Sequence, residues 1–537
     1  MNAQAFLDLP ARCDILVAGG GVGGIAAALA ACESGCRVVM TEPTAWIGGQ
    51  LTQQAVPPDE NQWIESGGAT RRYRLFREEV RAFYRRHYPL TPGARAQTAF
   101  NPGNGNVSRL CHEFRVGLAV LEAMVQPYVS NGRLVIARGC EPVHAEVSGD
   151  VVCAVTFRQL TTVTERRVAA AYVIDATETG DLLPLAGAEY VTGFESRAMT
   201  GEPSARDTYE PMNMQAVSWC FAVDHLEGED HVIAPPPDYA FWRAYVPDLK
   251  PAWGNPLLSW DATHPFTMKT EPCQFSPNVA QPKGPRENWT FRRIIDRAQY
   301  APGFYPSDIV LVNWPQIDYL PGPILDVVPE EKEKHLRGAR QLSLSMLYWM
   351  QTEAPRHDDP SRRGYPGLWL RSDVTGWGPD GLALHVYVRE SRRLQARFTV
   401  AEQHVARALR GEHGAERFAD SVGIGHYNID LHPSTGGDNY IDVPACPFQI
   451  PLGSLLPVRL RNLIAGAKNL GVTHITNGCY RLHPIEWNIG EAAGALAAHC
   501  LATKFPPAAV WENRERLAAF QGELVRQGFI LEWPEQG

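Results

Sequence analysis

The amino-terminal part of the chain combines apolar runs with a dense cluster of glycines. An apolar run at 14–18 has the character of a buried parallel strand, and five glycines crowd into 19–24 directly after it. An alanine-rich helical pattern then runs to about Ser34, and a second apolar run ends in Glu42. This order of strand, glycine turn, helix, strand and acid is typical of a dinucleotide-binding βαβ unit.

The same pattern analysis predicts the other elements and a division into domains. Proline becomes dense between about 200 and 390, and eight of the fourteen tryptophans fall between 241 and 380, which indicates an inserted domain. We therefore expect an α/β protein, with a Rossmann-type FAD-binding domain and an inserted α+β substrate or cap domain. The expected domain bounds are 1–200 with 395–505 for the FAD-binding domain, 201–394 for the insertion and 506–537 for a C-terminal helical extension. Helices are expected near 66–88, 115–124, 400–410 and 484–501, and further strands at 133–137, 151–157, 166–175 and 462–467.

The glycine turn has the residue types that a dinucleotide needs. Gly19 permits a tight turn, Gly21 lets the backbone approach a pyrophosphate, and Gly24 lets helix and strand pack closely. The helix that begins after Gly21 offers free N–H groups and partial positive charge to an anion. Glu42 stands where an acid accepts hydrogen bonds from an adenosine ribose, which favours FAD or NAD over NADP.

Two further features favour FAD over NAD. A second glycine turn at Gly48 and Gly49 suits the flavin-side phosphate and ribityl chain. The predicted helix after Pro484 carries a stripe of small residues, and its N-terminus could stabilise negative charge on a flavin pyrimidine. The alternative is that this stripe, made of Gly490, Ala493, Gly494 and Ala497, packs the helix on the sheet, and both interpretations can hold together.

Long segments resemble a known family. They include "DILVAGGGVGGIAAALAA", "YVIDATETGDLLPLAGAEYVTG" and "GVTHITNGCYRLHPIEWNIGEAAGALAA", and the similarity extends over nearly the whole chain. The chain resembles the FAD-dependent oxidoreductase family of the glutathione-reductase-type Rossmann branch. Many relatives have glycine where this chain has Glu178. The resemblance implies bound FAD, held by Gly19, Gly21, Val22, Gly23, Gly24, Glu42, Pro43, Gly49, Gln50, Leu51, Ala176, Thr177, Asn477 and Gly478.

Catalytic candidates gather before the C-terminal small-residue helix. Oxidation of an alcohol or amine needs a base whose pKa lies near neutral pH, and this requirement favours histidine. We expect His474 or His483 as the base, Arg481 as an anchor for an anionic group and Tyr480 beside them, while Glu486 suits the helix N-terminus. A structural role for either histidine is the alternative.

Weaker substrate candidates lie elsewhere, and no metal site is expected because no HExxH-type motif occurs. Arg71 and Arg72 open an arginine-rich helix whose charged face is more often just solvated. His426 belongs to a polar segment that either lines the substrate side of the flavin or packs between domains.

Composition narrows the function classes. The chain has 537 residues and a net charge of −9, which argues against general nucleic-acid binding. No CxxC pair, signal peptide or membrane span is recognised, so we expect a cytoplasmic protein with reduced thiols.

Without a second GxGxxG turn for NAD(P)H, electrons would come from a small-molecule substrate and leave to oxygen or another acceptor. The leading expectation is an oxidase or dehydrogenase that moves a hydride from a C–OH, C–N or C–C centre to flavin N5. A flavin monooxygenase or a non-catalytic flavin-bound protein is the alternative, and the oligomeric state stays open.

Overall fold

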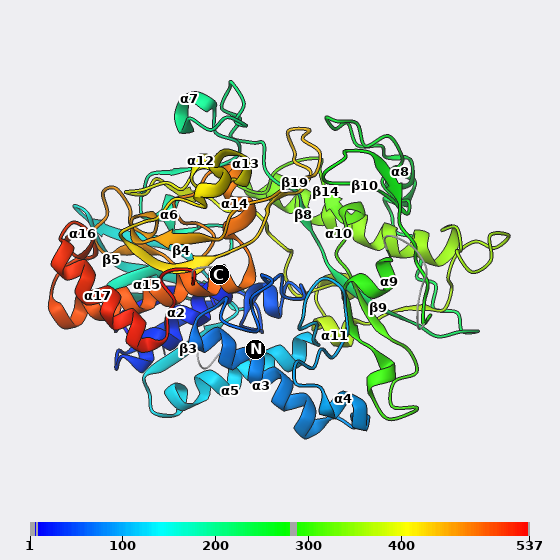
Figure 1. The fold of residues 1–537 in the computed structure, drawn as a ribbon, viewed down its shortest axis with the longest axis horizontal. Helices are drawn as coiled ribbons and strands as arrows, with labels where there is room; N and C mark the ends of the chain where they lie inside the picture. Colours follow the sequence, from blue (N-terminus) through cyan, green and yellow to red (C-terminus); the bar gives the residue numbers. More distant parts are fainter. Residues whose placement is uncertain (1–5, 7–8, 280–286, 535–537) are drawn as a thin grey trace.

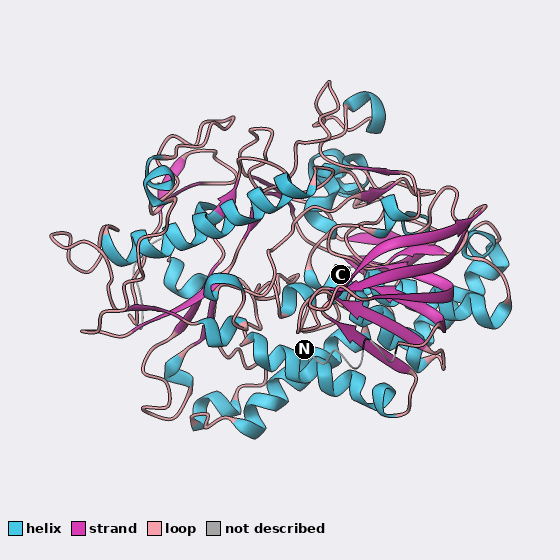
Figure 2. Cartoon of the chain, turned by 180° about the vertical axis from the view of Figure 1, so that it is seen from behind, coloured by secondary structure: helices cyan, strands magenta, loops and turns pink. Residues whose placement is uncertain are grey.

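A seven-stranded sheet forms the centre of the first part of the molecule (Figure 2). The computed structural model describes residues 6, 9–279 and 287–534. Parallel strands run in the order β3, β2, β1, β6, and β21 pairs with the end of β6. The antiparallel strands β5 and β4 extend the sheet from the start of β6. The strands are β1 (Arg12–Ala18), β2 (Val38–Glu42), β3 (Leu134–Arg138), β4 (Cys140–Ser148), β5 (Val151–Gln159), β6 (Glu165–Asp175) and β21 (Leu463–Ala465).

Two helices pack closely beside this sheet (Figure 1). Helix α2 (Val22–Glu33) follows the glycine turn, and α15 (His483–Thr503) is buried over nearly its whole length. A Cβ on Gly490 would lie 1.9 Å from the carbonyl oxygen of Gly23, and one on Gly494 would lie 2.2 Å from that of Ala27. Gly490 and Gly494 of the small-residue stripe therefore face helix α2, and α15 also contacts strands β1, β6 and β21 of the sheet.

A second sheet lies within the Trp-rich part of the chain, which is green in Figure 1. Its four antiparallel strands run in the order β12, β13, β9, β15. These strands are β12 (Arg293–Ile295), β13 (Ile309–Val312), β9 (Phe221–His225) and β15 (Leu368–Leu370), and the long helix in this part is α10 (Pro329–Thr352). The mixed α/β class is confirmed, while the predicted domain bounds remain predictions.

Several predicted elements differ in their bounds. Helix α3 (Arg71–His87) begins at the Thr70 cap, and α5 (Phe114–Ser130) runs past the predicted 115–124. The helix expected at 400–410 is interrupted at Ala406, whose extended backbone (φ −65°, ψ 125°) separates α12 (Glu402–Val405) from α13 (Arg407–Arg410). Strand β4 and helix α14 (His474–Tyr480) were not predicted.

Short elements complete the fold. Two helices, α16 (Pro507–Trp511) and α17 (Arg514–Gln527), form most of the C-terminal segment. Among the residues that the structure describes, no helix is both long and apolar enough to cross a membrane. The two-stranded pairs are β7 (Tyr190–Val191) with β16 (Arg393–Leu394), β8 (Val217–Ser218) with β14 (Asp318–Tyr319), β10 (Asp261–Thr263) with β11 (Thr270–Pro272), β17 (Ser421–Gly425) with β20 (Phe448–Pro451), and β18 (Ile429–Leu431) with β19 (Ile441–Val443).

Candidate active site

The first glycine turn is forced by backbone packing. Gly19 has a φ of +98°, a backbone conformation that is strained for a residue with a side chain. A Cβ on Gly19 would lie 2.2 Å from the carbonyl oxygen of Ala176, and one on Gly24 would lie 1.9 Å from the carbonyl oxygen of Gly19. The turn therefore contacts the end of β6 on one side and the first turn of α2 on the other, which matches the tight-turn and close-packing roles expected of these glycines.

The second glycine turn lies against the first. Gly48 and Gly49 both have positive φ, at +112° and +55°. The Gly48 amide donates to the carbonyl oxygen of Gly20 at 2.7 Å, and a Cβ on Gly49 would lie 2.9 Å from Cα of Gly21. Two stretches of glycine backbone thus meet, and neither of them contributes a side chain to the junction.

Glu42 braces this junction from the end of β2. Its buried carboxylate accepts hydrogen bonds from the amides of Gly20 at 3.2 Å and Thr44 at 2.8 Å, and from Nε2 of Gln53 at 2.9 Å. Burial raises the pKa of Glu42 to about 7. Because a carboxylate has roughly four acceptor positions, three bonds leave capacity for a hydroxyl donor.

One pocket brings together six of the predicted cofactor residues from three separate chain segments. Among the other residues that line it are Glu178, Lys332 and His385. An acid and glycine backbone at one end of parallel strands is the arrangement expected for an adenine dinucleotide. The six residues are Gly19, Gly21, Glu42, Pro43, Ala176 and Thr177.

The other predicted cofactor residues occupy the surroundings of this pocket. Val22 and Gly23 form the start of α2, and Leu51 is buried in the second turn. Gln50 donates to the carbonyl oxygen of Arg481 at 2.9 Å, which ties the second turn to the segment before α15.

Helix α14 contributes the remaining two cofactor candidates. Nδ2 of Asn477 has no hydrogen-bond partner among the described residues. A Cβ on Gly478 would lie 2.9 Å from the amide nitrogen of Asp430, so Gly478 packs against β18. Cofactor contact at Asn477 and Gly478 stays a prediction.

Glu178 extends into the junction of the two glycine turns. Its Oε1 would lie 2.6 Å from a Cβ on Gly21 and 3.0 Å from one on Gly49. The carboxylate forms a short ion pair with Lys468, whose Nζ is also 3.9 Å from Oε2 of Glu486. A negatively charged oxygen therefore occupies the place where both turns leave room for an anion, and a buried ammonium group stands beside it.

Two of the catalytic candidates make internal contacts. Nδ1 of His474 lies 3.0 Å from Oε1 of Glu390, and its ring stacks on Phe194 at 4.4 Å. The Tyr480 hydroxyl donates to the carbonyl oxygen of Gln449 at 2.7 Å. These contacts are those of a packed core, and a catalytic role for His474 or Tyr480 remains a prediction without geometric support.

His483 has one free ring nitrogen in a buried position. Its Nδ1 accepts a hydrogen bond from the Asp59 amide at 3.0 Å, while Nε2 has no partner among the residues described. Burial lowers the pKa of His483 to about 3, with the charges of Arg292 and Arg481 acting in the same direction. Because Nδ1 accepts this hydrogen bond, the neutral ring carries its proton on Nε2 and can donate from there. The role of base expected of His483 stays a prediction that its lowered pKa does not favour.

Arg481 is buried and keeps one donor unused. Nη1 donates to the Tyr387 hydroxyl at 2.7 Å and Nη2 to Oδ2 of Asp430 at 3.0 Å. Its Nε has no hydrogen-bond partner in the described part of the chain. The anchoring role expected of Arg481 stays a prediction, and its free donor supports that role.

The weaker substrate candidates have other partners. Arg71 pairs with Glu33 at 3.0 Å on the surface, and Arg72 forms ion pairs with Glu33 and Glu491. His426 lies edge-on to Trp63 with ring centroids 4.9 Å apart. A substrate role for Arg71, Arg72 and His426 therefore remains a prediction that their contacts do not favour.

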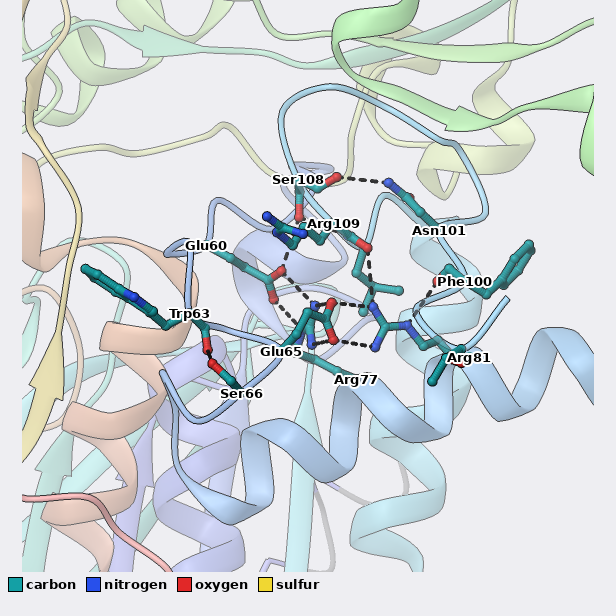
Figure 3. A network of polar contacts seen from close by, with 12 residues as sticks. Glu60, Trp63, Glu65, Ser66, Arg77, Arg81, Phe100, Asn101, Ser108 and Arg109 are labelled. Carbon is teal, nitrogen blue, oxygen red and sulfur yellow. Dashed lines mark hydrogen bonds and ion pairs between the residues drawn. The ribbon is translucent and has the colours of Figure 1, made fainter. Parts of the chain in front are cut away.

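Arg77 and Arg81, farther along α3, are buried, contrary to the expectation of a solvated face, and Figure 3 shows their polar contacts. Nε of Arg77 donates to Glu60 at 2.8 Å, and both Arg77 and Arg81 bind Glu65, at 2.7 and 2.6 Å. Ion pairs inside a protein need such multiple hydrogen bonds to offset desolvation. This network fixes Glu60 and with it the neighbouring residue Asp59.

Sequence reasoning missed Asp59 and Arg292. Both side chains are largely buried, and Oδ1 of Asp59 lies 3.9 Å from Nη1 of Arg292. Each of these two atoms lacks a hydrogen-bond partner among the described residues. The residues stand 233 positions apart in the sequence with no motif around either, so their proximity follows from tertiary structure alone.

Comparison with known proteins identifies the family. The model of a family described as FAD dependent oxidoreductase matches residues 14–524. The chain belongs to this family. It is therefore an FAD-dependent oxidoreductase, and FAD is its cofactor. No protein of curated function matches the sequence.

Solved structures of other proteins are similar to part of the chain. THI4 of Thermovibrio ammonificans is 19% identical over 36% of this chain and 70% of its own, with a TM-score of 0.24. The flavin-dependent brominase Bmp2 is 12% identical over 42% of this chain and 48% of its own, with a TM-score of 0.25. The myxobacterial chondrochloren halogenase CndH is 13% identical over 42% of this chain and 46% of its own, with a TM-score of 0.21. This chain thus spans less than half the length of the two halogenating enzymes.

The residues of the glycine junction fit FAD. The cofactor's pyrophosphate needs backbone without side chains, free N–H groups and a nearby cation. The two glycine turns, the start of α2 and Lys468 supply these, and the carboxylate of Glu178 already takes an anion's position there. We infer that the pyrophosphate binds at this junction and that Lys468 pairs with it.

Glu178→Gln is expected to tighten FAD binding about tenfold or more. The substitution removes a negative charge from the pyrophosphate position, where like-charge contact costs several kcal/mol, and it frees Lys468. The dissociation constant can be measured by titrating apoprotein with FAD and following flavin fluorescence. Glu189→Gln is a matched control, because Glu189 pairs with Arg459 at a half-exposed position. Weaker FAD binding by the Glu178→Gln variant would show that the carboxylate assists the cofactor.

Proposed function

We propose that the protein oxidises a small polar molecule at a C–OH, C–N or C–C centre by transfer of a hydride to FAD. Bound FAD supplies the hydride acceptor at N5 of its isoalloxazine ring. The reduced cofactor would then be reoxidised by oxygen or another acceptor. The observation that carries this proposal is a set of buried polar atoms, on Asp59, Arg292, Arg481 and His483, that have no hydrogen-bond partner within the described part of the chain. Buried polar groups in native proteins are almost always paired, so these atoms suit a polar substrate.

Asp59 is our candidate for the proton acceptor in this reaction. Oxidation of an alcohol or amine releases a proton from the heteroatom, and a base must take it. Burial raises the pKa of the Asp59 carboxyl above its ordinary value, which brings it closer to the pH at which a base is effective. The Nε2–H of His483 would orient the substrate heteroatom by donating a hydrogen bond.

Anaerobic reduction of the bound flavin tests the proposed function. We expect the purified yellow protein to bleach when a suitable alcohol, amine or saturated compound is added without oxygen. NAD(P)H consumption that is stimulated by a substrate would instead indicate a monooxygenase. Persistent absorbance with every compound, in a protein that retains FAD, would indicate a flavin-bound protein without turnover.

Asp59→Asn is expected to slow flavin bleaching about 10²- to 10⁴-fold at saturating substrate. The amide keeps the shape of the side chain but cannot accept the proton. Stopped-flow absorbance under anaerobic conditions measures the rate, and the FAD content measures the integrity of the site. Asp207→Asn is the control, because the Asp207 side chain is 92% exposed. An unchanged bleaching rate in the Asp59→Asn variant would exclude Asp59 as the base.

A further inference from the structure

Arg292 is a buried cation with two nitrogen atoms to which no described residue offers a hydrogen-bond acceptor. It lies between α9 (Asn288–Phe291) and strand β12, with its side chain 11% exposed. Nε and Nη1 are both buried and have no hydrogen-bond partner among the residues that the structure describes. The carboxylate of Asp59 is 3.9 Å from Nη1, which is too long for a hydrogen bond. A buried charge that lacks hydrogen bonds is costly unless a ligand supplies them.

The neighbouring buried arginine follows the usual rule. Arg293 donates from Nη1 to Asp308 at 2.9 Å and from Nε to the carbonyl oxygen of Gly103 at 2.8 Å. Its Nη2 lies 3.3 Å from Oδ2 of Asp296. The same chain therefore pairs one buried guanidinium in full and leaves the adjacent one open.

Further unused donors lie in the same region. Nε of Arg481 and Nε2 of His483 also lack partners within the described residues. The charges of Arg292 and Arg481 both lower the pKa of His483, and both also lower the pKa of Asp59, so each guanidinium group lies within electrostatic range of these two residues. Asp59 links Arg292 to His483, because its amide donates to the His483 ring and its carboxylate lies 3.9 Å from Arg292. Two cations and one neutral donor thus lie around Asp59, and among the described residues Asp59 and Asp430 each add one unpaired carboxylate oxygen to the cluster.

We propose that Arg292, Arg481 and His483 form a binding subsite for a carboxylate group of the substrate. A carboxylate accepts several hydrogen bonds at once and is stabilised by charge, which matches orphaned N–H groups on two guanidinium ions. The proposal deepens the proposed function, because it gives the oxidised molecule an anionic end held beside Asp59. The substrate class is then a hydroxy, amino or saturated carboxylic acid.

Binding of simple carboxylates to the FAD-loaded protein tests this subsite without any turnover. The probes are acetate, benzoate and succinate, each compared with its neutral amide at constant ionic strength. The readouts are the visible spectrum of the flavin and the midpoint of thermal unfolding, which rises when a ligand binds the native state. We expect at least one acid to bind saturably, while its amide binds at least tenfold more weakly.

Variants assign the binding to Arg292. Arg292→Gln is expected to weaken binding of the acid at least tenfold, because the substitution removes a charged hydrogen-bond donor from the carboxylate. Arg292→Lys retains the charge and should weaken binding of the acid less. If the Gln variant fails to fold, the Lys variant tests whether the acid binds through Arg292. Arg86→Gln is the matched control on the surface, where Arg86 pairs with Glu79. Asp59→Asn should bind the acid at least as tightly as the wild type, since a competing negative charge is removed.

The possible results separate the two proposals. The subsite is excluded if none of the acids binds, if amides bind as well as acids, or if acid binding survives Arg292→Gln. If acids bind through Arg292 but no substrate bleaches the flavin anaerobically, the carboxylate subsite is supported and the proposed hydride-transfer function is excluded.

Discussion

Gly21→Trp is expected to abolish FAD retention while the chain stays soluble. Already the Cβ of a side chain at position 21 would lie 2.6 Å from Oε1 of Glu178 and 3.9 Å from Cα of Gly49. An indole ring continues from that atom into the junction of the two glycine turns, where the pyrophosphate is inferred to bind. Gly21 itself has a negative φ of −67°, so the backbone does not forbid a side chain there and the damage should be local.

The measurement is the ratio of flavin to protein absorbance after gel filtration. Gly93→Trp is the matched control, because a Cβ on Gly93 meets no atom within 4 Å and the residue is exposed. We expect the Gly93→Trp variant to keep its FAD. Retention of FAD by the Gly21→Trp variant would place the pyrophosphate elsewhere.

Gly490→Ala is expected to lower the free energy of unfolding by about 3 kcal/mol or more, at the upper end of overpacking substitutions. A Cβ on Gly490 would lie 1.9 Å from the carbonyl oxygen of Gly23 and 2.5 Å from its Cα. Both contacts are with backbone, which cannot move aside as a flexible side chain can. Helices α2 and α15 must therefore separate, and α2 carries amides that we expect to face the cofactor. The variant should also lose FAD more readily.

The same substitution at Gly522 provides the control. Gly522 lies inside α17, and its added Cβ would meet only Nη1 of Arg526 at 3.6 Å. Because alanine favours a helix interior by roughly 0.5–1 kcal/mol over glycine, Gly522→Ala should stabilise the protein slightly. Urea unfolding of the two variants measures the difference. Equal stability of both would mean that the α2–α15 contact tolerates a methyl group.

The polar residues near α15 show where sequence reasoning reached its limit. His483 and Arg481 were recognised as candidates because they stand together in the chain, yet the base role expected of histidine does not suit His483. Its protonation follows from the backbone amide of Asp59, 424 positions away. The arginines of α3 illustrate the same limit, because Glu60 and Glu65 neutralise Arg77 from a preceding loop that carries no helical pattern.

Local pattern determined the nucleotide-binding half of this protein. The strand, glycine turn, helix and acid occupy contiguous residues, so backbone sterics and the hydrophobic period alone predict the turn at Gly19, the close packing at Gly24 and the strand that ends in Glu42. Only the tertiary structure decided that α15 packs on α2, that Glu178 reaches the junction of the glycine turns, and that Arg292 meets Asp59. Each of these contacts brings together segments that lie more than a hundred residues apart in the sequence. Which buried charges are left without a partner depends on those contacts, so residue spacing along the chain cannot predict it.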